Sequence, residues 1–306
     1  MTSPRTVIRG ESIPSVLKDY LPVSIDYLSF TIPNGNPSEI CKEVKSLLGV
    51  WERSEVRSGG MHGYVHAEHV GGFGIIAYGG DSQKGTVFVS INGQGCARIA
   101  SFRFLADWAV GLGARITRLD IAADDLKSRC FSVRRGLNAW RSDRFNCGGR
   151  MPNARLINDL GSQNGKTLYI GSRAGGKLCR IYEKGRALGD KLSRWVRAEV
   201  ELHAKDRVIP WDAVTNPVPF LAGTYPFFEK FSFFAERIST FKAGAELSIE
   251  KITQWARLAV GKTLNVLVRA SGGDLESVVL SLRRDGVPAR LKAWFDKSGE
   301  ALPCPA

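Results

Sequence analysis

Two segments of the sequence place several acidic side chains close together. The first runs from Arg118 to Asp125 (RLDIAADD) and the second from Val196 to His203 (VRAEVELH). Side chains on a strand point alternately to its two faces. Glu199 and Glu201 are therefore expected on the face away from the apolar residues of the second segment, and Asp120 on the face away from those of the first. Two such strands could form a cup of carboxylate oxygens, the ligands that Mg²⁺ and Mn²⁺ prefer.

A simpler interpretation of these acids is a solvated sheet face whose charges balance neighbouring arginines. Half-exposed strands alternate in this way by default. The chain, however, carries 43 Lys and Arg against 30 Asp and Glu, for a net charge of +13. A concentration of acids on two strands of so basic a chain favours a binding role without proving a metal, and both interpretations stay open.

A third pattern places a tyrosine between cations. Residues 167–173 and 177–184 are typical of two strands joined by a short glycine-containing turn. On the second strand Arg180, Tyr182 and Lys184 share one face. Nearby positive charge favours the ionised, nucleophilic form of a phenol, and the same cations can hold a phosphodiester. The alternative is an aromatic ring packed on the sheet with its hydroxyl bonded locally.

The excess of basic residues indicates a polyanionic partner, because each neutralised phosphate of a nucleic acid releases condensed counterions. Charge that merely keeps the protein soluble is the alternative. Six cysteines lie far apart without a Cys-x-x-Cys pair, as expected for reduced thiols. Since no apolar run has the length of a signal peptide core or a membrane span, we expect a cytoplasmic protein without a membrane partner.

The elements that position these side chains mix strands and helices. Strand patterns occur at 23–32, 64–70, 72–78, 86–91, 115–123, 167–172, 177–183 and 195–203, and helical patterns at 39–48, 102–112 and 131–140. Beyond Pro210 the pattern is helical, with amphipathic runs at 245–259 and 275–284 and an end segment at 290–295. We predict an α+β fold with an antiparallel-rich sheet and packed helices, followed by a small helical C-terminal region.

Four motifs, taken in order, resemble the phage and plasmid replication initiation factor family. They lie at 118–125, 166–173, 180–184 and 197–202. The family includes filamentous-phage replication proteins, rolling-circle plasmid initiators and related conjugative relaxases. The resemblance implies a replication-initiator or relaxase-like fold and a metal-dependent enzyme that nicks and rejoins one DNA strand at an origin through a covalent phosphotyrosine. The resemblance covers about residues 22–210, the expected catalytic nicking domain. Composition and pattern add a flexible lead-in (1–21) before it and the helical C-terminal region (211–306) after it.

By position, the resemblance implies that Tyr182 is the nucleophile, with Tyr169 as the alternative. It implies that Asp120, Glu199 and Glu201 bind Mg²⁺ or Mn²⁺. The basic residues expected to contact DNA are Arg173, Lys177, Arg180, Lys184 and Arg197. The expected partners are origin DNA, single-stranded or supercoiled, together with host helicase and polymerase. Two other functions fit the residues: a non-catalytic DNA-binding protein of replication or copy control, and a two-metal nucleic-acid enzyme without a covalent step.

Overall fold

The computed structural model describes residues 21–51, 56–57, 60–231, 235–238 and 249–284. The chain separates into two compact units, Met1–Thr240 and Phe241–Ala306. The sequence-predicted lead-in, apart from Leu21, and the predicted end segment at 290–295 lie outside the described residues. Within the described part of the chain, no helix combines the length and the apolar character needed to cross a membrane.

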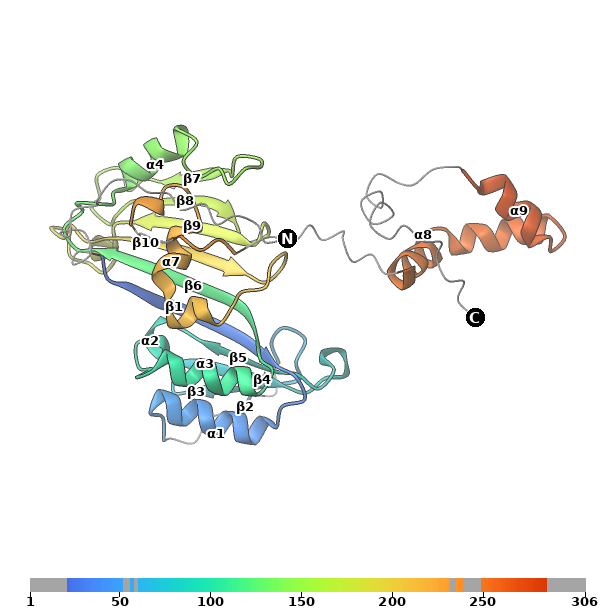
Figure 1. The fold of residues 1–306 in the computed structure, drawn as a ribbon, viewed down its shortest axis with the longest axis horizontal. Coiled ribbons are helices and arrows are strands. Elements are labelled where there is room, and N and C mark those ends of the chain that lie inside the picture. The colour runs from blue at the N-terminus through green and yellow to red at the C-terminus, as the bar shows by residue number, and fades with distance from the viewer. Residues whose placement is uncertain (1–20, 52–55, 58–59, 232–234, 239–248, 285–306) are drawn as a thin grey trace, which may run out of the picture. The chain divides into compact units, whose positions relative to one another are not determined.

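The first unit is built on a ten-stranded sheet whose described pairings are all antiparallel (Figure 1). The spatial order is β2-β3-β4-β5-β1-β6-β10-β9-β8-β7. The strands are β1 (Val23–Ile32), β2 (Val56–Arg57), β3 (His66–Val70), β4 (Gly74–Tyr78), β5 (Val87–Ile91), β6 (Arg115–Asp125), β7 (Ala154–Ile157), β8 (Thr167–Ser172), β9 (Lys177–Tyr182) and β10 (Val196–His203). The predicted α+β class with an antiparallel sheet is confirmed.

Two short strands escaped the sequence analysis. β2 has two residues and β7 has four, so neither is long enough to display an alternating pattern. Each forms an edge of the sheet, where pairing with one neighbour, β3 or β8, holds it in place. Their existence therefore depends on the partner strand.

The first unit also contains helices, several of which pack on the sheet. They are α1 (Pro37–Leu48), α2 (Gly93–Cys96), α3 (Phe102–Gly111), α4 (Val133–Arg141), α5 (Lys184–Ala187), α6 (Asp212–Thr215) and α7 (Pro217–Ala222), with 3-10 turns η2 (Asp81–Gln83) and η3 (Glu229–Phe231). Figure 1 shows α2, α3 and α7 in front of the strands. The Phe30 ring of β1 meets Trp108 of α3 and Trp211 edge to face, at centroid distances of 6.4 and 5.3 Å. Bulky apolar side chains thus fill the space between sheet and helices.

The apolar face of the central strands is continuous. Leu119 lies opposite Leu202, and Ile121 lies opposite Val200, all fully or nearly fully buried. At β9 the same face carries Ile181, against which Gly136 of α4 packs so closely that an added Cβ would lie 2.7 Å from Ile181 Cδ1. The opposite face of β6, β9 and β10 is consequently the one that holds the polar side chains.

The boundary near residue 210 differs from the one predicted. Residues 212–222 form α6 and α7, and α7 packs on β1 and β6, so this stretch belongs to the unit that contains the sheet. Phe220 and Leu221 are buried in that core, which explains why a helical pattern did not mark a separate region. The second unit, described by itself, contains α8 (Ile249–Ala270) and α9 (Leu275–Leu282).

Candidate active site

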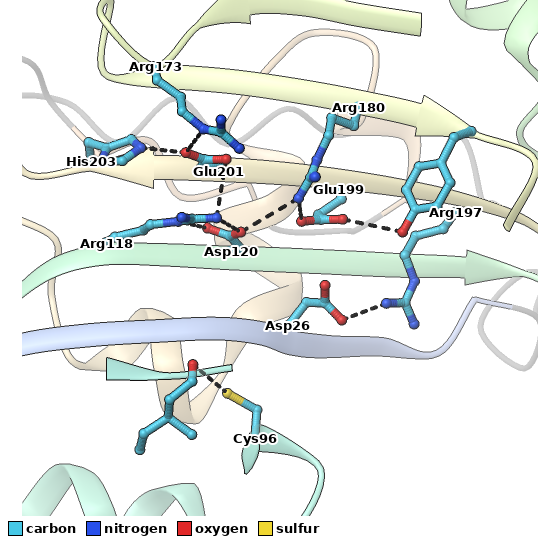
Figure 2. Close-up of polar contacts among 12 residues, drawn as sticks. Asp26, Cys96, Arg118, Asp120, Arg173, Arg180, Arg197, Glu199, Glu201 and His203 are labelled. Carbon is cyan, nitrogen blue, oxygen red and sulfur yellow. Dashed lines mark hydrogen bonds and ion pairs between the residues drawn. The ribbon is translucent and has the colours of Figure 1, made fainter. Parts of the chain in front are cut away.

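Strand pairing brings the three predicted metal ligands together on the polar face. β10 pairs with β6 so that Glu201 lies directly opposite Asp120, and Glu199 lies opposite Ala122. The three side chains are at most 1% exposed. We refer to Asp120, Glu199 and Glu201 as the acidic cluster (Figure 2).

Arginines bind the acidic cluster from the solvent side. Nη2 of Arg118 lies 2.6 Å from Asp120 Oδ2 and 3.2 Å from Glu201 Oε2. Arg180 pairs with Glu199, and its Nη2 lies 3.8 Å from Asp120 Oδ2. The Arg118 and Arg180 side chains are 23% and 25% exposed whereas the acids are buried, so the guanidinium groups lie between the cluster and solvent.

The carboxylates of the cluster differ in protonation behaviour. Burial raises the pKa of Glu199 to about 7, against the opposing charge of Arg180. Burial also raises the pKa of Asp120, although Arg118 counteracts it. Burial has the same tendency at Glu201, but hydrogen bonds from His203 and Arg173 and the charge of Arg118 outweigh it and lower the pKa of Glu201 to about 2. At neutral pH Glu201 is therefore ionised, whereas Glu199 titrates close to pH 7.

The donor chemistry of the acidic cluster suits a hard divalent cation, because three carboxylates converge around shared guanidinium nitrogens. Glu201 Oε2 is buried and has no hydrogen-bond partner among the described residues, although it lies near Arg118. As arranged, however, no three His, Cys, Asp or Glu side chains in the described part of the chain form a ready-made metal site. A cation would have to take the place that the guanidinium groups now hold.

Tyr182 lies at the end of β9 beside this cluster. Its hydroxyl donates to Glu199 Oε2 at 3.5 Å. Burial and then the negative charge of Glu199 raise the pKa of the Tyr182 hydroxyl above its ordinary value of 10, which reverses the phenolate-favouring effect expected from the sequence. The hydroxyl is thus held protonated at neutral pH.

The two cations predicted to activate Tyr182 contact groups other than its hydroxyl. Arg180 is paired with Glu199. Lys184 Nζ lies 5.7 Å from the centroid of the Tyr182 ring, a cation–π position over the ring. The charge of Arg180 is therefore compensated by Glu199, and Lys184 contacts the ring of Tyr182.

Arg197 lies opposite Tyr182 but is tied into a buried ion network. Its Nη2 lies 2.7 Å from Asp124 Oδ2, and its Nη1 lies 2.6 Å from Asp26 Oδ1. Trp195 Nε1 also donates to Asp124, at 2.6 Å. The predicted DNA contact Arg197 therefore has structural partners on β6 and β1.

A protein-family model matches the part of the chain that contains the acidic cluster and Tyr182. Residues 114–234 match the family model described as replication initiation factor, and they include the acidic cluster and Tyr182. The resemblance to replication initiation factors is confirmed. A search of curated proteins found no match.

A rolling-circle replication initiator protein from Geobacillus stearothermophilus has a similar fold. The two structures superpose with a TM-score of 0.52 and 23% sequence identity, over 66% of this chain and 82% of that one. At this identity the similarity concerns the fold.

Within residues 114–234, which match the family model, the structure distributes the remaining predicted DNA contacts over two faces. Arg173, with a side chain 61% exposed, donates to Glu201 Oε1 at 2.8 Å and so borders the acidic cluster. Lys177 does not reach the cluster: it shares the face of Cys179, where its Nζ donates to Thr224 O at 2.6 Å and lies 3.9 Å from the Tyr225 ring centroid. Burial lowers the pKa of Lys177.

The sequence analysis missed Asp26 and the link from Trp195 to Asp124. The alternation of β1 assigns Asp26 to the same face as Leu28, which is the core face. A register shift in β1 between Ile25 and Tyr27 moves it, because the extra residue of a bulge changes the face on which the following side chains lie. The signal that could have marked the bulge is a change of phase in the apolar pattern, from Val23 and Ile25 to Leu28, Phe30 and Ile32.

Tyr169, the alternative nucleophile, lies on β8, one strand further from the acidic cluster than Tyr182. It is directly opposite Arg180, and the Arg155 guanidinium lies 4.9 Å from its ring centroid. Of the two tyrosines, Tyr182 is the one whose hydroxyl contacts the cluster.

Proposed function

We propose that this protein initiates rolling-circle DNA replication by nicking one strand at an origin, with Tyr182 as the nucleophile. The observation that carries the proposal is the hydrogen bond from the Tyr182 hydroxyl to Glu199, inside an arginine-bordered acidic cluster of a replication initiation factor segment. A phenol, a carboxylate acceptor and guanidinium groups are the components that phosphoryl transfer to tyrosine requires.

The proposed step exchanges one phosphodiester for another. The Tyr182 oxygen forms a bond to phosphorus while the bond between phosphorus and the 3′ oxygen breaks. The tyrosine proton passes to Glu199, its hydrogen-bond acceptor, and the departing 3′ oxygen takes a proton from solvent. The products are a 5′-phosphotyrosine and a free 3′-hydroxyl, and the reverse reaction rejoins the strand without ATP because the phosphotyrosine retains the phosphodiester bond energy.

Arginines that border the acidic cluster would hold the DNA backbone. Arg180 lies two residues before Tyr182 on β9, and Arg173 lies at the Glu201 end of the cluster; both are partly exposed. Contacts of this type position the DNA backbone without reading its sequence. The buried Arg197 would instead keep β10 and β6 in register below the reacting groups.

Asp120, Glu199 and Glu201 would hold Mg²⁺ or Mn²⁺. Such a cation, when bound, offsets the negative charge that develops on the phosphoryl oxygens. Because Arg118 and Arg180 occupy the carboxylates, cation binding requires these guanidinium groups to move, which leaves them available for phosphate.

The further partners in this proposal are host helicase and polymerase, which would act at the free 3′ end, and the expected compartment is the cytoplasm. The match to replication initiation factors supports a DNA partner, and so does the basic charge of the chain.

A covalent adduct tests the proposal. Supercoiled plasmid carrying the replicon's own origin is incubated with Mn²⁺ and protein, and DNA-linked protein is detected on a denaturing gel. Wild type and Tyr169→Phe should form the adduct, whereas Tyr182→Phe should not, although it should still bind the origin. An adduct that persists in Tyr182→Phe and disappears in Tyr169→Phe would move the nucleophile to β8, and absence of any adduct would favour a non-catalytic DNA-binding protein or a two-metal enzyme without a covalent step.

A further inference from the structure

A groove of about 460 Å³ lies beside the acidic cluster, over β7, β8 and β9. Its lining includes Arg155, Tyr169, Arg173 and Arg180. None of the described residues that line it carries a carboxylate. A concave, cationic and partly aromatic surface of this size suits one anionic, planar ligand.

Strand register connects the groove to the candidate nucleophile. Arg155 lies opposite Tyr169, Tyr169 opposite Arg180, and Arg180 opposite Glu199, which gives one row across four strands. Neighbouring side chains in such a row are in direct reach of one another. Tyr182 lies two residues beyond Arg180 on β9, and its hydroxyl contacts Glu199 at the end of this row. A DNA strand held at Tyr182 can therefore extend along the row into the groove, towards the sheet edge formed by β7.

The chemistry of the row matches a nucleotide. Tyr169 is half-buried and therefore anchored, while its ring carries the Arg155 guanidinium at 4.9 Å. Arg155 is exposed, and the Arg173 side chain is 61% exposed, so both can reach a phosphate. Arg180 also lines the groove, and its Nε is buried without a hydrogen-bond partner among the described residues.

We propose that this groove binds one unpaired nucleotide adjacent to the scissile phosphate, with its base stacked on Tyr169 and its phosphate held by Arg155 and Arg173. The proposal rests on the proposed nicking function and specifies the side chains that contact the nucleotide next to the scissile phosphate. Stacking on Tyr169 requires this base to be unpaired, because a base within a duplex has both of its faces covered by neighbouring base pairs. Tyr169 is then a binding residue and not the nucleophile.

Fluorescence of a substituted base tests the proposal. A single-stranded origin oligonucleotide carries 2-aminopurine on one or the other side of the scissile phosphate and is bound to the Tyr182→Phe protein, which leaves it uncleaved. Stacking should quench the fluorescence at one of the two positions. Adding Tyr169→Ala should abolish that quenching and weaken binding about 5- to 150-fold, whereas adding Tyr169→Phe should preserve both.

The controls separate this proposal from the nicking function. Tyr78→Ala, on β4, should leave quenching and affinity unchanged. Arg155→Gln, at an exposed position, should weaken binding and reduce its salt dependence. Unchanged quenching and affinity in Tyr169→Ala would overturn the groove assignment even if Tyr182 is the nucleophile. Conversely, an adduct that persists in Tyr182→Phe would overturn the nucleophile while these binding results still stand.

Discussion

A substitution of Arg197 tests whether this residue contacts DNA or stabilises the fold. Its guanidinium is nearly buried, donates to Asp124 at 2.8 Å from Nε, and pairs with Asp124 and Asp26 through its two terminal nitrogens. Replacing Arg197 by Met would leave the buried Asp124 without its main counter-charge. Removing one partner of a buried ion pair costs about 3–5 kcal/mol. Because Trp195 continues to donate to Asp124, we expect the lower end of that range.

A loss of about 3 kcal/mol is large against the total of about 5–15 kcal/mol that stabilises a typical protein. The assay is urea denaturation at pH 7, followed by circular dichroism, together with origin affinity at low urea. Arg103→Met is the matched control, since Arg103 and Asp107 form an exposed pair with side chains 79% and 69% exposed, and its midpoint should not move. The reasoning is refuted if Arg197→Met unfolds at the wild-type urea concentration but has lost its affinity for DNA.

Three further predictions concern charge. Glu199→Gln should abolish nicking, because the amide cannot take the tyrosine proton, yet leave origin binding and the circular dichroism spectrum unchanged; wild-type nicking at limiting Mn²⁺ would contradict its role. The logarithm of the affinity for duplex DNA should fall linearly with the logarithm of salt concentration, with a slope of about −5 for about six phosphate contacts, and a slope near zero would mean that the net charge of +13 serves solubility. His203, Arg173 and Arg118 lower the pKa of Glu201 to about 2, against the effect of burial. The ionised carboxylate therefore stabilises the fold fully at pH values above 4.5, the ordinary pKa of a glutamate, and this contribution is lost as the pH falls towards 2. The free energy of unfolding, measured by urea titration at successive pH values, should differ most between wild type and Glu201→Gln at pH 7, and the difference should shrink below about pH 4.5. A difference that is the same at every pH would contradict this prediction.

Local sequence pattern determined the secondary structure and the faces of the central strands. The period-two alternation of residues 196–203 assigned Glu199 and Glu201 to one face and their apolar neighbours to the other, and β10 has that arrangement. The same rule separated Arg180 and Tyr182 from the core side of β9. Lys177 was predicted to contact DNA, but the same rule, applied to it, places it on the core side with Cys179 and explains why it does not reach the acidic cluster.

Tertiary structure decided which charges meet. β6, β10 and β9 are neighbours although they are far apart in the chain, and their register pairs Glu201 with Asp120 and places Arg180 against Glu199. A bulge in β1 then adds Asp26, which alternation alone assigns to the wrong face. The register between these strands depends on long-range pairing that no local periodicity encodes.

The protonation of Tyr182 shows the physical reason for the difference. In the sequence its close neighbours are Arg180 and Lys184, whose charges favour a phenolate. In the folded protein burial and the carboxylate of Glu199 prevail and raise the pKa of the hydroxyl, because Arg180 is already paired with that carboxylate. Residue types and alternation could be read along the chain, whereas electrostatic energies depend on distance and burial in three dimensions, which only the assembled sheet sets.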